Sequence, residues 1–104
     1  MKKRVLFVDD EPRVLQGLQR MLHPMRKEWE MHFVESGQQA LEVLSKHDFD
    51  VIVSDMRMPG MTGADLLEEV KKRYPRVVRF ILSGHSDHDL ILKSVGCAHQ
   101  YLTK

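Results

Sequence analysis

The chain has 104 residues, of which 42% are hydrophobic and 30% are charged, and its formal net charge is +1. This length fits one domain, and this composition excludes a disordered chain. The near-neutral charge disfavours a basic nucleic-acid-binding module, and the apolar runs are too short to span a bilayer. We therefore expect one domain over residues 1–104. Because no apolar export segment follows the basic N-terminus, we also expect a cytoplasmic location.

Short apolar runs along the chain predict five strands. They lie at residues 5–8, 31–34, 51–53, 77–82 and 100–102. Continuous apolar runs are typical of strands that are buried on both faces of a parallel sheet.

Helical patterns separate these runs. Pro12 suits a first helical position, and apolar residues follow it at helical spacing as far as Leu22. The pair at 36–37 opens a second helix, and residues 62–65 have the form of a capping box ahead of a third, where Gly63 favours close packing. A similar polar group at 86–89 precedes a fourth helix, which Gly96 ends.

The alternation of strands and helices predicts an α/β fold, with a doubly wound five-stranded parallel sheet and helices on both faces. Such a sheet has a final helix after its fifth strand, whereas this sequence stops at Lys104. We therefore expect that the final helix is missing, that the domain is incomplete at its C-terminus, and that the natural protein is longer. Apolar surface on the face of the first helix should then be exposed.

Three carboxylates stand at the ends of two predicted strands. Asp9 and Asp10 follow the first strand, and Asp55 follows the third. If these strands are neighbours, the side chains converge, because ligand sites in open α/β sheets lie beyond the carboxyl ends of the strands. Such a cluster needs a cation or raised pKa values, and oxygen ligands favour Mg²⁺. The alternative is three ordinary aspartates in turns at strand ends.

Polar residues also follow the fourth and fifth strands. Ser83 and Gly84 come after the fourth strand, and Lys104 after the fifth. A hydroxyl, a backbone N–H and an ammonium group at this edge would suit the oxygens of a phosphoryl group. Each feature alone is typical of a plain turn or a solvated lysine, so the prediction depends on their combination.

In this combination the sequence resembles the receiver domains of two-component response regulators. The resemblance covers essentially the whole chain and depends on five features in order. They are the acidic pair Asp9-Asp10, the segment VIVSDMRMPGMTG around Asp55, the pair Ser83-Gly84, the small residues at 96–98, and the segment YLTK at 101–104.

The resemblance implies a flavodoxin-like strand order, 2-1-3-4-5, and a phosphorylation-dependent signalling switch. Asp55 would accept the phosphoryl group from a sensor histidine kinase or a phosphotransfer protein. Mg²⁺ would be held by Asp9, Asp10, Asp55 and the backbone carbonyl of Arg57. A receiver promotes its own phosphorylation and dephosphorylation and is not an enzyme with turnover.

The resemblance also implies roles near the phosphoryl group. Ser83, Gly84 and Lys104 would bind it, with Ser83 and Lys104 assisting the transfer. Ser83 and Tyr101 would form the switch that changes the face of the fourth helix and fifth strand. That face would be read by an output domain beyond Lys104 or by another partner, and a homodimer is compatible with this arrangement. The segment from 83 to 101 is similar to receivers joined to HD-related output domains.

Three other classes share part of this pattern. A phosphatase of the haloacid-dehalogenase type also uses an aspartate nucleophile with Mg²⁺, but it places a second aspartate where this chain has Arg57. A flavodoxin-like electron carrier needs a glycine-rich phosphate loop, whereas Glu11 and Pro12 follow the acidic pair here. An unphosphorylated pseudo-receiver, which keeps the fold as a binding module, stays the alternative to the switch.

Overall fold

The fold is described from a computed structural model, which covers residues 2–56, 58, 60–83 and 100–103. For residues 83 and 100–103 only the backbone is described. Its elements in chain order are β1 (Lys3–Val8), α1 (Pro12–Leu22), the 3-10 helix η1 (His23–Lys27), β2 (Trp29–Val34), α2 (Gly37–Lys46), β3 (Val51–Asp55), α3 (Gly63–Arg73), β4 (Val78–Ser83) and β5 (Gln100–Thr103). Strands and helices alternate as the sequence predicts, except that η1 was not expected. The helix expected over 86–96 lies outside the described residues.

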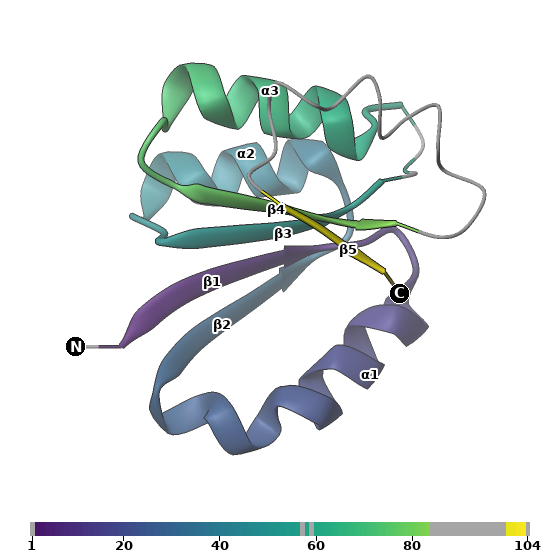
Figure 1. The fold of residues 1–104 in the computed structure, drawn as a ribbon, viewed down its shortest axis with the longest axis vertical. Helices are drawn as coiled ribbons and strands as arrows, with labels where there is room; N and C mark the ends of the chain where they lie inside the picture. The colour runs from purple at the N-terminus through teal and green to yellow at the C-terminus, as the bar shows by residue number, and fades with distance from the viewer. Residues whose placement is uncertain (1, 57, 59, 84–99, 104) are drawn as a thin grey trace.

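The strands form one parallel sheet in the order β2-β1-β3-β4-β5. In the part of the chain that the structure describes, α1 lies on one face of the sheet and α2 and α3 lie on the other (Figure 1). The predicted α/β class and the order of the first four strands are therefore confirmed. Strands β1 and β2 both begin earlier than the apolar runs suggest, because Lys3 pairs with Trp29 at the start of the ladder.

Local sequence explains where α2 and α3 begin. The Ser36 hydroxyl accepts a hydrogen bond from the Gln39 N–H at the start of α2. At α3, Thr62 and Asp65 bond each other's backbone N–H groups, which confirms the predicted capping box. In α1, the N-cap Glu11 makes no side-chain cap bond, and Pro12 at the first helical position sets the backbone instead.

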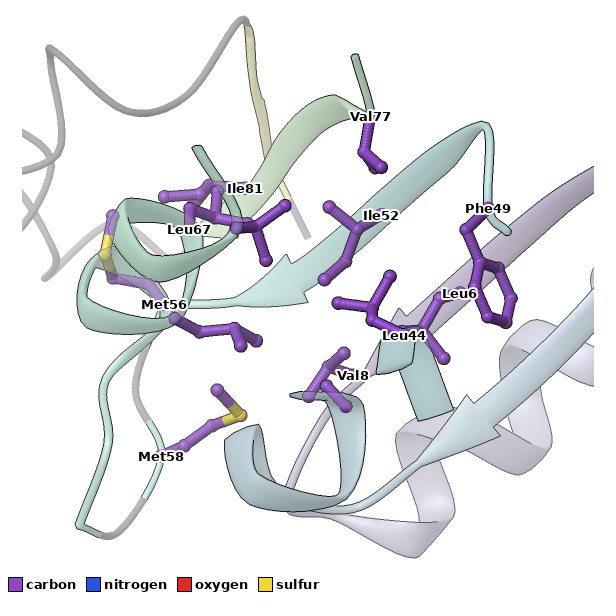
Figure 2. Close-up of a cluster of buried hydrophobic side chains, with 13 residues drawn as sticks. Leu6, Val8, Leu44, Phe49, Ile52, Met56, Met58, Leu67, Val77 and Ile81 are labelled. Atoms are coloured by element: carbon purple, nitrogen blue, oxygen red, sulfur yellow. The ribbon is translucent and has the colours of Figure 1, made fainter. Parts of the chain in front are cut away.

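The larger core lies between the sheet and helices α2 and α3. Alternate residues of the central strands, among them Leu6, Val8, Ile52 and Ile81, point into it and meet Leu67 of α3 (Figure 2). The strand residues between them point to the opposite face, where Val5, Phe7 and Val53 form a smaller cluster with Leu15 of α1. A groove of about 650 Å³ remains beside α1, and the exposed side chain of Met21 lies on its border.

Candidate acidic phosphoacceptor site

The site lies where β1 and β3 end. The two strands are parallel neighbours, and Val8 pairs with Ser54, so Asp9 and Asp55 follow at the same level of the sheet. One carboxylate oxygen from each of Asp9, Asp10 and Asp55 lies within 4.8 Å of the others. The structure therefore brings together the three carboxylates that the sequence singled out.

Two of these carboxylates are buried. Asp9 is 1% exposed and Asp55 is 4% exposed, whereas Asp10 is half-buried. Like charges about 4 Å apart repel by about 4 kcal/mol at an effective dielectric constant of 20, and burial adds the loss of hydration. An arrangement of this kind is stable when a cation or protons neutralise it, or when the surrounding fold holds it in place.

The backbone around Asp9 fixes its position. The N–H of Asp9 donates to the Val34 carbonyl at 3.2 Å, which ties the end of β1 to the end of β2. Its Oδ1 accepts a hydrogen bond from the Glu11 N–H at 2.9 Å. Because this N–H belongs to the start of α1, the Asp9 carboxylate also stabilises the turn into that helix.

The backbone around Asp55 is held from two sides. The N–H of Met56 donates to the Leu82 carbonyl of β4 at 3.1 Å, and the N–H of Gly63 donates to the Met56 carbonyl at 2.9 Å. A side chain at Gly63 would overlap the carbonyl oxygen of Asp55. The close packing expected at this glycine is therefore confirmed, and α3 begins directly against the peptide group of Asp55.

The donor set fits Mg²⁺. Hard divalent cations prefer carboxylate and carbonyl oxygens, and no nitrogen or sulfur ligand enters this cluster of three aspartates. Asp9, Asp10 and Asp55 are thus the described residues that could hold the ion. Arg57, whose carbonyl was predicted as a further ligand, lies outside the described residues.

The remaining predicted site residues are placed only in part. Ser83 ends β4 and pairs with Thr103 of β5, so its backbone lies at the same carboxyl edge as the acidic cluster. Tyr101 pairs with Ile81 in the backbone ladder. Gly84 and Lys104 lie outside the described residues, and their predicted roles stay predictions.

Sequence reasoning missed Ser54. This residue is completely buried, and its hydroxyl donates to the Asp55 carbonyl at 3.0 Å. The available signal was a hydroxyl side chain at a strand position whose neighbour on the same face, Ile52, is a core residue.

No described helix is long and apolar enough to cross a membrane.

Comparison with known proteins gives the family. Residues 5–104 match the response regulator receiver domain. The hydrogenase transcriptional regulatory protein HoxA of Cupriavidus necator is 39% identical over 102 residues, which are 96% of this chain and 20% of that protein. The chain thus spans about a fifth of the length of this relative.

Solved structures agree with this match. The signal receiver domain of an HD domain-containing protein from Pseudomonas fluorescens Pf-5 superposes with a TM-score of 0.93 and 32% identity, over 100% of this chain and 83% of that one. The response regulator TrrA of Thermotoga maritima, solved in complex with Mg²⁺-BeF, has a TM-score of 0.85 and 29% identity, over 98% and 86% of the two chains. The chain belongs to the response regulator receiver domain family of two-component signal transduction.

Proposed function

We propose that this domain is a signalling switch that accepts a phosphoryl group on Asp55. The observation that carries the proposal is the convergence of Asp9, Asp10 and Asp55 at the carboxyl edge of the sheet, in a chain of the receiver family. Of the three, Asp55 ends the central strand β3 and has its backbone held by β4 and α3. A nucleophile needs this kind of fixed position.

The transfer is a substitution at phosphorus. A carboxylate oxygen of Asp55 attacks the phosphorus of a phosphohistidine on a sensor histidine kinase or a phosphotransfer protein. The P–N bond breaks, the imidazole leaves with its electron pair and takes a proton, and an acyl phosphate forms on Asp55. In this reaction the domain is a regulatory phosphoacceptor, not a classical enzyme.

Asp9, Asp10, Asp55 and the carbonyl of Arg57 would hold Mg²⁺. The ion supplies positive charge that neutralises the carboxylates and the phosphoryl oxygens. The TrrA structure in complex with Mg²⁺-BeF supports this assignment by similarity. Lys104 would pair with the phosphoryl oxygens, and Ser83 and Gly84 would donate hydrogen bonds to them.

The signal would leave through the face that contains β5. Ser83 would move toward the phosphoryl group, Tyr101 would turn into the space that it vacates, and the surface of residues 86–103 would change. An output segment outside this chain would read the change in the cytoplasm. HoxA by its name is a transcriptional regulator, and the Pseudomonas relative is an HD domain-containing protein, so both output types are represented among the relatives.

Intact-mass spectrometry tests the proposal. The chain is incubated with acetyl phosphate with and without Mg²⁺, as wild type, Asp55→Asn and Asp48→Asn. Asp48 is an exposed aspartate in the loop between α2 and β3, and it serves as the matched control. We expect one Mg²⁺-dependent phosphoryl adduct on the wild type and on Asp48→Asn, and none on Asp55→Asn.

Two results would contradict the proposal. An adduct that persists in Asp55→Asn would place the phosphoryl group elsewhere. A wild-type chain that unfolds cooperatively in urea yet gains no phosphoryl group would favour the pseudo-receiver alternative, in which the fold serves as a binding module.

A further inference from the structure

Ser54 carries a buried hydroxyl next to the phosphoacceptor. The residue lies in the middle of the sheet, where it pairs with Val8 on one side and Ile81 on the other, and none of its surface is exposed. Its side chain projects on the same face as Ile52, into the larger core. An apolar side chain would suit this position, because burying a hydroxyl costs free energy unless it is hydrogen-bonded.

The hydroxyl is bonded to the peptide group of Asp55 itself. Ser54 Oγ donates to the Asp55 carbonyl oxygen at 3.0 Å. This carbonyl belongs to the last residue of β3, after which the chain leaves the sheet for the loop to α3. The bond therefore holds the strand end at the residue where the predicted nucleophile is attached.

The same carbonyl also lies against the start of α3. Gly63 approaches so closely that any side chain there would overlap the Asp55 oxygen. The Met56 N–H, which belongs to the same peptide group, donates to the Leu82 carbonyl, and the Gly63 N–H donates to the Met56 carbonyl of the next peptide group. The backbone at Asp55 is thus fixed by β3, β4 and α3 together.

We propose that Ser54 is a positioning residue for Asp55. Repulsion among Asp9, Asp10 and Asp55 drives the Asp55 carboxylate away from the cluster. The Ser54 hydroxyl restrains the Asp55 backbone through its carbonyl, and it therefore opposes the part of this movement that comes from rotation of that backbone. The bond keeps the carboxylate in place before a cation or phosphoryl group arrives. The proposal rests on the phosphoacceptor function proposed above.

The test compares two substitutions of nearly equal shape. Ser54→Thr and Ser54→Val both add bulk at the buried position, but only threonine keeps a hydroxyl that can donate to the Asp55 carbonyl. Two quantities are measured on the full chain. One is the Mg²⁺ dissociation constant by calorimetry without any phosphodonor, and the other is the rate of Asp55 phosphorylation by acetyl phosphate.

We expect Ser54→Val to weaken Mg²⁺ binding and to slow phosphorylation, each by about fivefold, which corresponds to the loss of one ordinary hydrogen bond. Ser54→Thr should stay within about twofold of the wild type in both measurements. Val77→Ala is the control for stability, because Val77 is a core residue just before the opposite end of β4. It should lower the urea midpoint without changing either quantity per folded molecule.

The possible failures are separable. Equal Mg²⁺ dissociation constants and equal rates for Ser54→Thr and Ser54→Val would overturn the positioning role. A shift of both quantities in Val77→Ala as large as in Ser54→Val would overturn it too, because general destabilisation would then explain the effect. If even the wild type gains no phosphoryl group, the proposed function fails, and the Mg²⁺ comparison between the two variants still decides the role of Ser54.

Discussion

On the face of the sheet that α2 and α3 cover, the described chain buries thirteen hydrophobic residues in one cluster, whereas it buries four beneath α1. Around the smaller cluster most apolar side chains are only partly buried, and the groove of about 650 Å³ lies among them. Because hydrophobic stabilisation scales with buried apolar area, the face of α2 and α3 supplies most of it. The two faces are thus unequal supports for the same five strands.

This inequality matters for the acidic cluster. Asp55 is held through Ser54, Met56 and Gly63, which belong to the strand, loop and helix on the well-packed face. Asp9 is held through β2 and the first turn of α1. In the described chain Asp55 is therefore held from the better-packed face, and Asp9 is held from the more open one.

The largest expected effect comes from the core of the well-packed face. Leu67 is fully buried there, so Leu67→Ala should lower the free energy of unfolding by about 2–5 kcal/mol, through lost burial and the cavity left behind. Leu18 packs only partly against the smaller cluster, and Leu18→Ala should cost less than about 1.5 kcal/mol. Urea denaturation measures both. Equal losses would show that the two faces are equally supported.

The helix caps give a second contrast. Thr62→Ala removes the hydroxyl of a reciprocal capping box on α3 and should cost about 1 kcal/mol. Ser36→Ala removes a single cap bond on α2 and should cost no more than Thr62→Ala. Urea unfolding at constant temperature gives both values, and hydrogen exchange at the Asp65 amide reports the local opening. An unchanged exchange rate in Thr62→Ala would contradict the role of the box.

A smaller effect is expected at the groove beside α1. Met21 is 67% exposed on its border, so Met21→Ser should change the free energy of unfolding by less than about 0.5 kcal/mol. The urea midpoint measures this change. A loss above about 1.5 kcal/mol would mean that the Met21 side chain is packed in solution, and the contrast between the two faces would then be smaller than the structure shows.

The smallest effect lies at the rim of the edge strand β2. The pKa of Glu30 is lowered from its ordinary value of 4.5 by a hydrogen bond with His32 and by the charges of Arg4 and His32, although burial acts in the opposite direction. The distances to Glu30 Oε2 are 3.1 Å from His32 Nε2 and 2.8 Å from Arg4 Nε. These contacts lie at the surface, where the Glu30 side chain is 46% exposed, so their effect is small.

The sign of this pH dependence follows from the lowered pKa. A carboxylate that is more acidic in the folded state stabilises the fold above its unfolded pKa of 4.5, and this stabilisation is lost as the pH falls through the folded pKa. Glu30→Gln should therefore be less stable than the wild type at pH 6, and the difference should shrink below pH 4. Urea midpoints at a series of pH values measure it. A difference that grows on acidification would contradict the assignment.

Much of the fold was predictable because local chemistry and tertiary packing agree. The apolar run of β1 is buried on both faces, and so are Ile52 and Val53 of β3, which is what an uninterrupted run indicates. The caps at Ser36 and Thr62 could also be predicted, since each hydroxyl accepts a hydrogen bond from the N–H group three residues later, which is a local pattern in the sequence. The helix η1 was not, because His23–Lys27 follows α1 without an apolar period of its own.

The site was predictable to a different extent. Asp9, Asp10 and Asp55 stand at strand ends, so convergence followed once the strand order was inferred from the family resemblance. The contact of Ser54 with the Asp55 carbonyl could not be predicted, because a hydroxyl in a strand has several acceptors within reach. In the structure the acceptor is the Asp55 carbonyl, which also lies against Gly63 of α3.

The Asp9-Asp10 pair and Asp55 are distant in sequence and meet only through the pairing of β1 with β3. An unfolded chain has no such cluster, so a divalent cation that binds it binds the native form alone. Mg²⁺ bound there would shift the folding equilibrium by mass action, by about 2.7 kcal/mol at a hundred times its dissociation constant. The concentration of the ion around the protein would thus change the fraction of the chain that is folded.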